Sequence, residues 1–132
     1  MAAERNEKER RRLPRAVFAP QEGLKAILTL SDNLLEQRAV QIMNISRSGL
    51  GLAIKKNETI GIEKGRLFFL SEIHSGKRNS IILPSMELKV VWIIEHDYLH
   101  NIGFGCVFLN PNERNIHNII DFINDNFPGR LI

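Results

Sequence analysis

Residues 101–127 read NIGFGCVFLNPNERNIHNIIDFINDNF, and within this stretch the hydrophobic period changes from that of a strand to that of a helix. Apolar side chains alternate in the first part, as in a strand with one buried face. In the second part, apolar residues at helical spacing would form one stripe: Ile116, Ile119, Ile120, Ile123 and Phe127. We therefore predict a last strand over 101–109 and a helix over about 111–127, ended by Pro128-Gly129.

The predicted helix also carries the residues of an N-terminal cap. Asn110 can accept a hydrogen bond from a free backbone N–H, and Pro111 suits the first helical position because it lacks an N–H. Glu113 stands where a capping box requires an acidic side chain. We expect the helix to begin directly after Asn110.

The segments upstream of residue 101 with strand character are rich in apolar and β-branched residues: 24–30, 38–45, 49–54, 66–73 and 81–94. In 38–45, alternation would place Val40 and Ile42 on one face, with Asn44 next in the same series. Pro84 marks a bend or an edge position. No helical pattern separates these strands, which argues against a parallel sheet with crossover helices. The sequence therefore predicts a small antiparallel barrel of about six strands with the helix docked on it.

Length and composition indicate one packed domain, which we assign to residues 10–132. The chain has 132 residues, of which 43% are hydrophobic. No apolar run approaches the roughly 20 residues needed to cross a bilayer, so we expect no membrane insertion. A single cysteine, Cys106, excludes an internal disulfide and a multi-cysteine metal site, and we expect a cytoplasmic protein.

The net charge of +3 comes entirely from the N-terminal segment. Residues 1–15 hold six basic and three acidic side chains, and six minus three gives +3; the remaining 117 residues hold twelve of each sign. A short basic arm of this kind is typical of a segment that binds a small anionic ligand, a nucleic acid or a membrane surface. Residues 1–9 are mainly polar, and we expect them to be disordered.

The arm contains the first of two short motifs, Arg10-Arg11-Arg12-Leu13-Pro14-Arg15, in which Arg11 and Arg15 form an R-x-x-x-R pattern. An arginine side chain presents a planar fork of donors that matches phosphate oxygens and the O6/N7 edge of guanine. Pro14 disfavours a helix here, so the two side chains need not point apart. The alternative interpretation of this motif alone is a solvated basic tail.

The second motif is Asn44-Ile45-Ser46-Arg47-Ser48-Gly49, which reads N-x-S-x-x-G. The Asn44 amide can donate and accept hydrogen bonds, Ser46 adds a hydroxyl, and Gly49 permits a positive φ and a close approach of a ligand. Taken alone, this motif could also be an ordinary turn whose side chains satisfy their own backbone. Together the two motifs supply mobile guanidinium donors and a polar turn, the two halves of a site for guanine and phosphate.

With these two motifs in this order, the sequence resembles the PilZ domain family over about residues 10–127. Val90-Val91-Trp92 and Gly105-Cys106-Val107-Phe108, before the final helix, add weaker support. The resemblance implies a mainly β fold: a six-stranded antiparallel, split β-barrel with a C-terminal α-helix and a flexible basic N-terminal arm. It also implies a bacterial receptor for cyclic di-GMP that is not an enzyme and needs no other cofactor.

The resemblance further implies which residues bind the dinucleotide. Two arm arginines would grip guanine and phosphate: Arg11 and Arg15. Three barrel positions would receive the guanine: Asn44, Ser46 and Gly49. A basic residue directly before the arginine motif, here Arg10, accompanies binding of an intercalated pair of ligand molecules in this family. Further candidates are Arg12, Arg47 and Trp92.

The expected mechanism is an ordering of the arm by the ligand, which would bridge the arm to the turn at residues 44–49. Ordering costs roughly 1–2 kcal/mol per residue, and charge-assisted hydrogen bonds of about 1.5–3 kcal/mol each would have to exceed that cost. The changed surface would be read by an unidentified protein effector that controls motility, biofilm or exopolysaccharide. We expect a monomer or a weak homodimer.

Several alternatives stay open on the sequence alone. One is a PilZ-like protein–protein interaction module that binds no nucleotide. Another is a small barrel that binds RNA or single-stranded DNA, which would require exposed aromatic side chains among basic ones. The charge-neutral body gives little support for that function, so we expect no DNA or RNA partner. The sequence carries no recognisable catalytic constellation, and its scattered histidines predict no metal site.

Alternation predicts that Cys106 is buried between Phe104 and Phe108, in the core rather than as a reactive thiol. Three large aromatic side chains are expected in the core as well: Phe68, Phe69 and Trp92. For Trp92 a place on the ligand-binding surface is the alternative.

Overall fold

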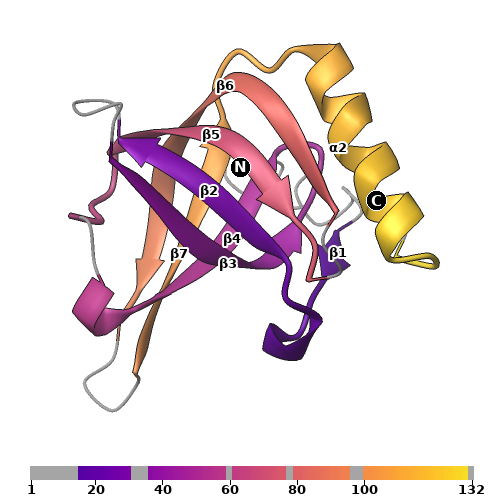
Figure 1. Cartoon of the computed structure of the whole chain (residues 1–132). Coiled ribbons are helices and arrows are strands. Elements are labelled where there is room, and N and C mark those ends of the chain that lie inside the picture. Colours follow the sequence, from indigo (N-terminus) through magenta and orange to yellow (C-terminus); the bar gives the residue numbers. More distant parts are fainter. Residues whose placement is uncertain (1–14, 31–35, 59–60, 77–78, 96–99, 131–132) are drawn as a thin grey trace, which may run out of the picture.

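Six antiparallel strands form a closed barrel in this computed structural model, which describes residues 15–30, 36–58, 61–76, 79–95 and 100–130. The strands are β2 (Lys25–Leu30), β3 (Gln37–Ile45), β4 (Gly49–Lys55), β5 (Leu67–His74), β6 (Ser80–Ile94) and β7 (Asn101–Phe108). They run in the order β3-β2-β5-β6-β7-β4, and β4 pairs back onto β3 (Figure 1). The predicted mainly β barrel with a C-terminal helix is confirmed, while the arm at residues 10–14 lies outside the described residues.

A short seventh strand, β1 (Ala16–Val17), precedes the barrel and is not predicted by the sequence analysis. It pairs antiparallel with the end of β3, so that Ala16 faces Ile45 and Val17 faces Asn44. Two residues are too few to give a periodic signal, which explains why the strand is not visible in the sequence. Its position matters because it fixes Arg15 directly beside the second motif.

The remaining elements are two single-turn helices and one long helix. The short ones are η1 (Pro20–Glu22) and η2 (Lys56–Glu58). The long one, α2 (Glu113–Asn126), lies along one side of the barrel (Figure 1) and buries four isoleucines of the predicted stripe: Ile116, Ile119, Ile120 and Ile123. The described helices include none that is long and apolar enough to cross a membrane.

Helix α2 begins two residues later than predicted. Its N-cap is Asn112, whose side chain accepts a hydrogen bond from the backbone N–H of Arg114 at 2.8 Å. Asn110 instead has a φ of 47°, a left-handed conformation that asparagine tolerates better than most residues. The two asparagines have the same capping chemistry, and Asn110 is used to turn the chain out of β7.

The core fills the barrel and the space between the barrel and α2. The inward positions of β4 and β7 carry alternating apolar side chains, among them Leu52 and Phe104, both without exposed surface. Phe68 is also fully buried, as predicted, whereas Phe69 is only half-buried. Phe69 follows Phe68 directly on β5, and neighbouring residues of a strand point to opposite faces.

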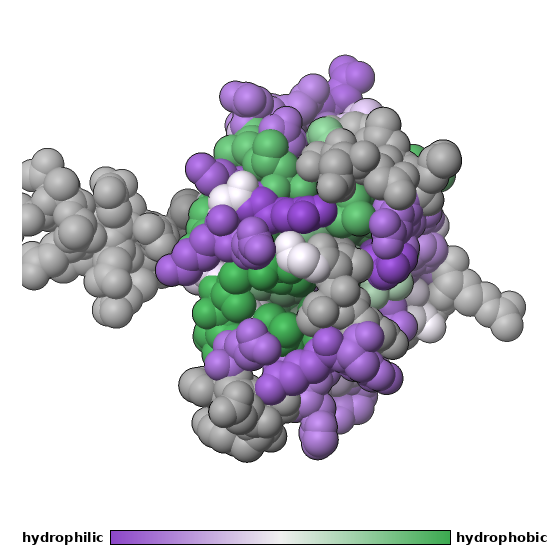
Figure 2. All heavy atoms as spheres, turned by 90° about the vertical axis from the view of Figure 1, so that its left-hand side faces the viewer, coloured by the Kyte–Doolittle hydropathy of each residue, from purple (hydrophilic) through white to green (hydrophobic). Residues whose placement is uncertain are grey.

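The outer surface is mixed in polarity. Figure 2 shows that the face on the left of Figure 1 is largely hydrophilic, with hydrophobic surface exposed between the hydrophilic side chains. The exposed large apolar side chains among the described residues are Val17, Ile82, Val91 and Ile94. Val17 and Ile94 line one hollow of about 690 Å³ together with Met43, and exposed apolar side chains do not by themselves identify a site.

Candidate functional site

A β-bulge in β3 turns Asn44 to the outer face of the barrel. Ile42 pairs with Leu52 of β4, while Asn44 pairs with the neighbouring Gly51, so Met43 is the extra residue. Ile42 is fully buried and Asn44 is half-buried. The expectation that Asn44 shares a face with Val40 and Ile42 is therefore wrong, because the bulge reverses the alternation.

A second bulge, in β6, does the same for Trp92. Val90 pairs with Cys106 of β7 and Trp92 pairs with the neighbouring Gly105, so Val91 is the extra residue. Val90 is buried, whereas Trp92 is half-buried on the outer face. Trp92 therefore lies outside the core, contrary to the first expectation for this side chain.

The two reoriented side chains stand at the ends of one row across four neighbouring strands. Asn44 pairs with Gly51, Gly51 with Gly105, and Gly105 with Trp92. A Cβ atom on Gly51 would lie 2.9 Å from Cγ of Asn44, and one on Gly105 would overlap the Trp92 indole. The Asn44 amide therefore packs on the backbone of Gly51 and the Trp92 indole on that of Gly105, where a larger residue would leave them no room.

Three members of this row, Asn44, Gly51 and Trp92, line a hollow of about 270 Å³ on the barrel surface. The predicted site residues that line it are Arg15, Asn44, Ser46, Gly49 and Trp92. Ser48 and Gly51 also line it and were missed as site residues. The glycines of Gly49-x-Gly51 and Gly103-x-Gly105 are visible in the sequence, but their pairing across the sheet is not.

The other predicted site residues are not in this hollow or cannot be placed. Arg47 is exposed in the turn between β3 and β4 and does not line the hollow. Arg10, Arg11 and Arg12 lie outside the described residues. Of the arm, the described structure therefore provides one cation to the hollow, the exposed guanidinium of Arg15.

The turn between β3 and β4 is held by its own polar groups. The Ser46 N–H donates to the Gly49 carbonyl at 3.0 Å, and the Ser48 N–H donates to Ser46 Oγ at 3.2 Å. The two serine hydroxyls lie 2.9 Å apart, and the Ser48 carbonyl accepts from the N–H of Phe108 in β7. Ser46 is buried, so its hydroxyl is fixed in place at the edge of the hollow.

Gly49 is required for a different reason from the one expected. It does not have a positive φ. Instead, β7 approaches so closely that a Cβ atom would overlap the Cys106 carbonyl oxygen and lie 3.1 Å from Val107 Cα. The glycine therefore permits tight pairing of β4 with β7 directly below the turn.

Cys106 points into the core, as predicted, with 3% of its surface exposed. Burial raises the pKa of its thiol to about 12, because the thiolate would lose its hydration. The described residues contain no group of three or more histidine, cysteine, aspartate or glutamate side chains that could hold a metal ion. The groups that line the hollow can form hydrogen bonds, supply one positive charge and offer an aromatic ring.

We expect Cys106 to react very slowly with a thiol reagent in the native protein. At pH 8 the native thiol is almost entirely protonated and is covered by its neighbours, while the thiolate is the reacting species. Labelling with a chromogenic disulfide should be slow in buffer and fast in denaturant, where the thiol has an ordinary pKa near 8.5. Equal rates in the two conditions would contradict this assignment.

Comparison with known proteins gives one family and a set of structural neighbours. A sequence model of the family described as PilZ domain matches residues 9–125. Among curated protein sequences, none matches this chain. Among solved structures, the PilZ domain of YcgR from Escherichia coli with c-di-GMP has a TM-score of 0.63 at 18% identity, over 88% of this chain and 92% of that one.

Two longer proteins contain a similar barrel. The K. pneumonia MrkH-c-di-GMP complex matches 86% of this chain at 17% identity, with a TM-score of 0.61. The Borreliella burgdorferi PlzA protein in complex with c-di-GMP matches 92% at 13% identity, with a TM-score of 0.57. The match covers 51% of MrkH and 54% of PlzA, so the chain spans about half of these proteins. At such identities the likeness is one of fold.

Proposed function

Because this chain belongs to the PilZ domain family, we propose that it is a receptor for cyclic di-GMP. The observation that carries the proposal is one hollow that joins Arg15 to the turn with Asn44, Ser46 and Gly49. The structures of YcgR, MrkH and PlzA that share the fold contain c-di-GMP, which agrees with this ligand class. The function is one of binding and signalling rather than catalysis.

The side chains of the hollow suit a guanine base next to a phosphate. The guanidinium fork of Arg15 can donate two parallel hydrogen bonds to the O6/N7 edge of guanine or to phosphate oxygens. Asn44 and Ser46 offer neutral donors and acceptors for the remaining edges of the base. The indole of Trp92 lines the hollow and offers a surface on which the base can stack.

The small volume of the hollow supports a contribution of the arm to binding. Its volume of about 270 Å³ is below the roughly 300–1,000 Å³ of pockets that enclose a drug-sized ligand. We propose that the arm residues upstream of Arg15 close over the ligand, with Arg11 on guanine or phosphate and Arg10 and Arg12 beside it. A second ligand molecule, intercalated with the first, would be held by Arg10.

The output would be a changed surface over the hollow rather than a chemical product. Ligand binding would shift the arm toward one ordered position on the barrel. A protein effector that controls motility, biofilm or exopolysaccharide in a bacterial cytoplasm would read this surface. Arg47, exposed at the tip of the neighbouring turn, would lie at the edge of that surface.

Titration with cyclic di-GMP tests the proposal directly. We expect saturable heat in calorimetry and a parallel change in intrinsic fluorescence, which comes from Trp92 because the chain has one tryptophan. GMP and a short single-stranded oligonucleotide are the controls, and both should bind more weakly. Tighter binding of the oligonucleotide would favour the nucleic-acid alternative, and no binding of any of the three would favour the interaction module.

A further inference from the structure

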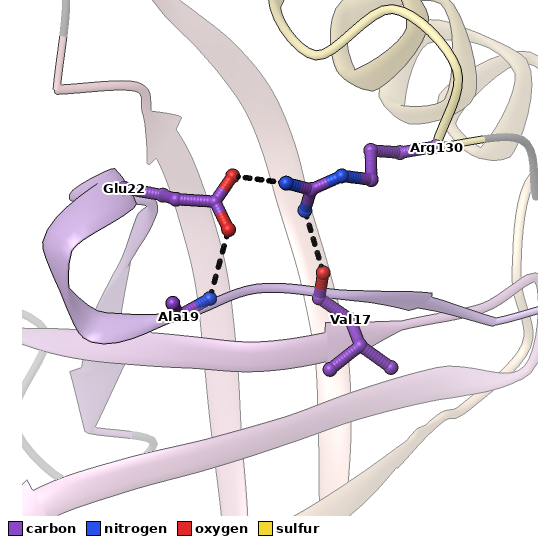
Figure 3. A network of polar contacts seen from close by, with 4 residues as sticks. All are labelled: Val17, Ala19, Glu22 and Arg130. Carbon is purple, nitrogen blue, oxygen red and sulfur yellow. Dashed lines mark hydrogen bonds and ion pairs between the residues drawn. The ribbon is translucent and has the colours of Figure 1, made fainter.

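A polar clasp joins the segment after α2 to the segment that follows Arg15 (Figure 3). One terminal nitrogen of Arg130 donates to the Val17 carbonyl and the other to Glu22 Oε2, both at 2.7 Å. The second carboxylate oxygen of Glu22 accepts from the N–H of Ala19 at 2.9 Å. The clasp consists of these four residues and bridges more than one hundred positions of sequence.

Two aromatic side chains pack next to the clasp. The Arg130 guanidinium lies 5.4 Å from the centre of the Phe18 ring, a cation–π geometry. Phe18 is buried and meets Phe127 edge to face, with 5.0 Å between the ring centres. The pKa of Glu22 is lowered by its backbone hydrogen bond from Ala19 and by Arg130, so the carboxylate is ionised throughout the neutral range.

The opposite edge of β1 contacts the strand that carries the second motif. Val17 pairs with Asn44, and the N–H of Phe18 donates to the Met43 carbonyl at 2.9 Å. A two-residue strand has few ladder hydrogen bonds of its own, so its docking depends on what holds its outer edge. The clasp holds that edge at Val17, two residues from Arg15.

We propose that Arg130 is a positioning residue for ligand binding: by holding β1 against β3, it keeps Arg15 in the hollow. The inference rests on the proposed function. It gives Arg130, at the C-terminal end of the described residues, a role in ligand binding. If β1 is docked in only a fraction of molecules, the apparent Kd rises by the inverse of that fraction. Coupling is reciprocal, so a bound ligand tightens the clasp and the contact with Phe127 at the end of α2.

The test compares Arg130→Ala with the matched variant Arg38→Ala. Arg38 also donates to a backbone carbonyl, that of Gln37 at 3.0 Å, and pairs with a carboxylate, that of Glu36 at 2.7 Å. Its side chain is 42% exposed against 38% for Arg130, but it lies at the start of β3, outside the hollow. If β1 is docked on β3 in one molecule of ten in Arg130→Ala, titration calorimetry with cyclic di-GMP should show a Kd about tenfold higher than that of wild type. The Kd of Arg38→Ala should be unchanged.

Two further readouts separate positioning from a merely structural role. Amide hydrogen exchange of Phe18 without ligand should be at least about tenfold faster in Arg130→Ala than in Arg38→Ala, because opening of β1 exposes this N–H in most molecules instead of in a small fraction. Arg130→Lys keeps the positive charge but lacks the guanidinium that donates to both the Val17 carbonyl and Glu22. Its Kd should therefore lie between the wild-type and alanine values. Agreement of exchange, Kd and partial rescue supports the proposal.

The proposal and the proposed function fail in different ways. If wild-type protein binds the dinucleotide and Arg130→Ala binds it equally well or more tightly, Arg130 does not position the site and the inference is overturned. A lowered melting temperature with an unchanged Kd would lead to the same conclusion. If the wild-type protein does not bind cyclic di-GMP, the proposed function itself is wrong and the coupling is overturned with it.

Discussion

Replacement of Arg15 by alanine is expected to weaken cyclic di-GMP binding by about 100-fold or more, since two charge-assisted hydrogen bonds contribute about 1.5–3 kcal/mol each and 1.4 kcal/mol corresponds to tenfold. Arg15 lines the hollow together with Asn44 and Ser46. Its side chain is exposed, so its removal leaves the core intact. The loss should therefore appear in affinity, measured by titration calorimetry, and not in the melting temperature.

Two further variants make this prediction specific. Arg15→Lys keeps the positive charge but cannot form the planar pair of hydrogen bonds, and we expect it to recover only a small part of the affinity. Arg114→Ala removes another exposed cation, on α2 and outside the hollow, and should bind like wild type. An Arg15→Ala protein with the affinity of Arg114→Ala would show that the guanidinium fork at position 15 does not bind the ligand.

The barrel could be predicted from the sequence because its determinants are local. Each barrel strand has an apolar alternation or run long enough to be recognised, and the isoleucines of α2 repeat at helical spacing. The strand β1 has neither, and its existence depends on partners remote in sequence, Asn44 on one edge and Arg130 on the other. A two-residue strand of this kind is fixed by tertiary contacts alone.

Five of the residues that line the hollow were named from the sequence, but their arrangement was not. Asn44 and Trp92 reach the same face because a bulge in β3 and another in β6 each insert one residue. A bulge changes the register without a clear sequence signal, so alternation put Asn44 on the face of Val40 and Ile42, and Trp92 was first expected in the core. Asn44 packs on Gly51 and Trp92 on Gly105, and the pairing of these two glycines can be read only from the folded sheet.

A second large effect is expected from Gly49→Ala, which should lower the free energy of unfolding by about 3 kcal/mol or abolish folding. The added methyl group would overlap the Cys106 carbonyl oxygen. Because this obstacle is backbone of a paired strand, relief requires β7 to move away from β4, which breaks hydrogen bonds and opens the core behind Leu50. Urea denaturation monitored by Trp92 fluorescence would measure the change.

Gly103→Ala is the matched control in the same pair of strands. Its methyl group would make ordinary contacts, 3.6 Å from Met43 Cε and 3.8 Å from Trp92 Cζ3, and Gly103 has no positive φ. We expect its stability to lie within about 0.5 kcal/mol of wild type, since alanine also reduces the entropy of the unfolded chain. The difference in the free energy of unfolding between the two variants measures the effect of the close approach of β7 at Gly49. Equal denaturation midpoints would mean that β7 can yield at this point, and that the glycine of the second motif is not required by the packing of the barrel.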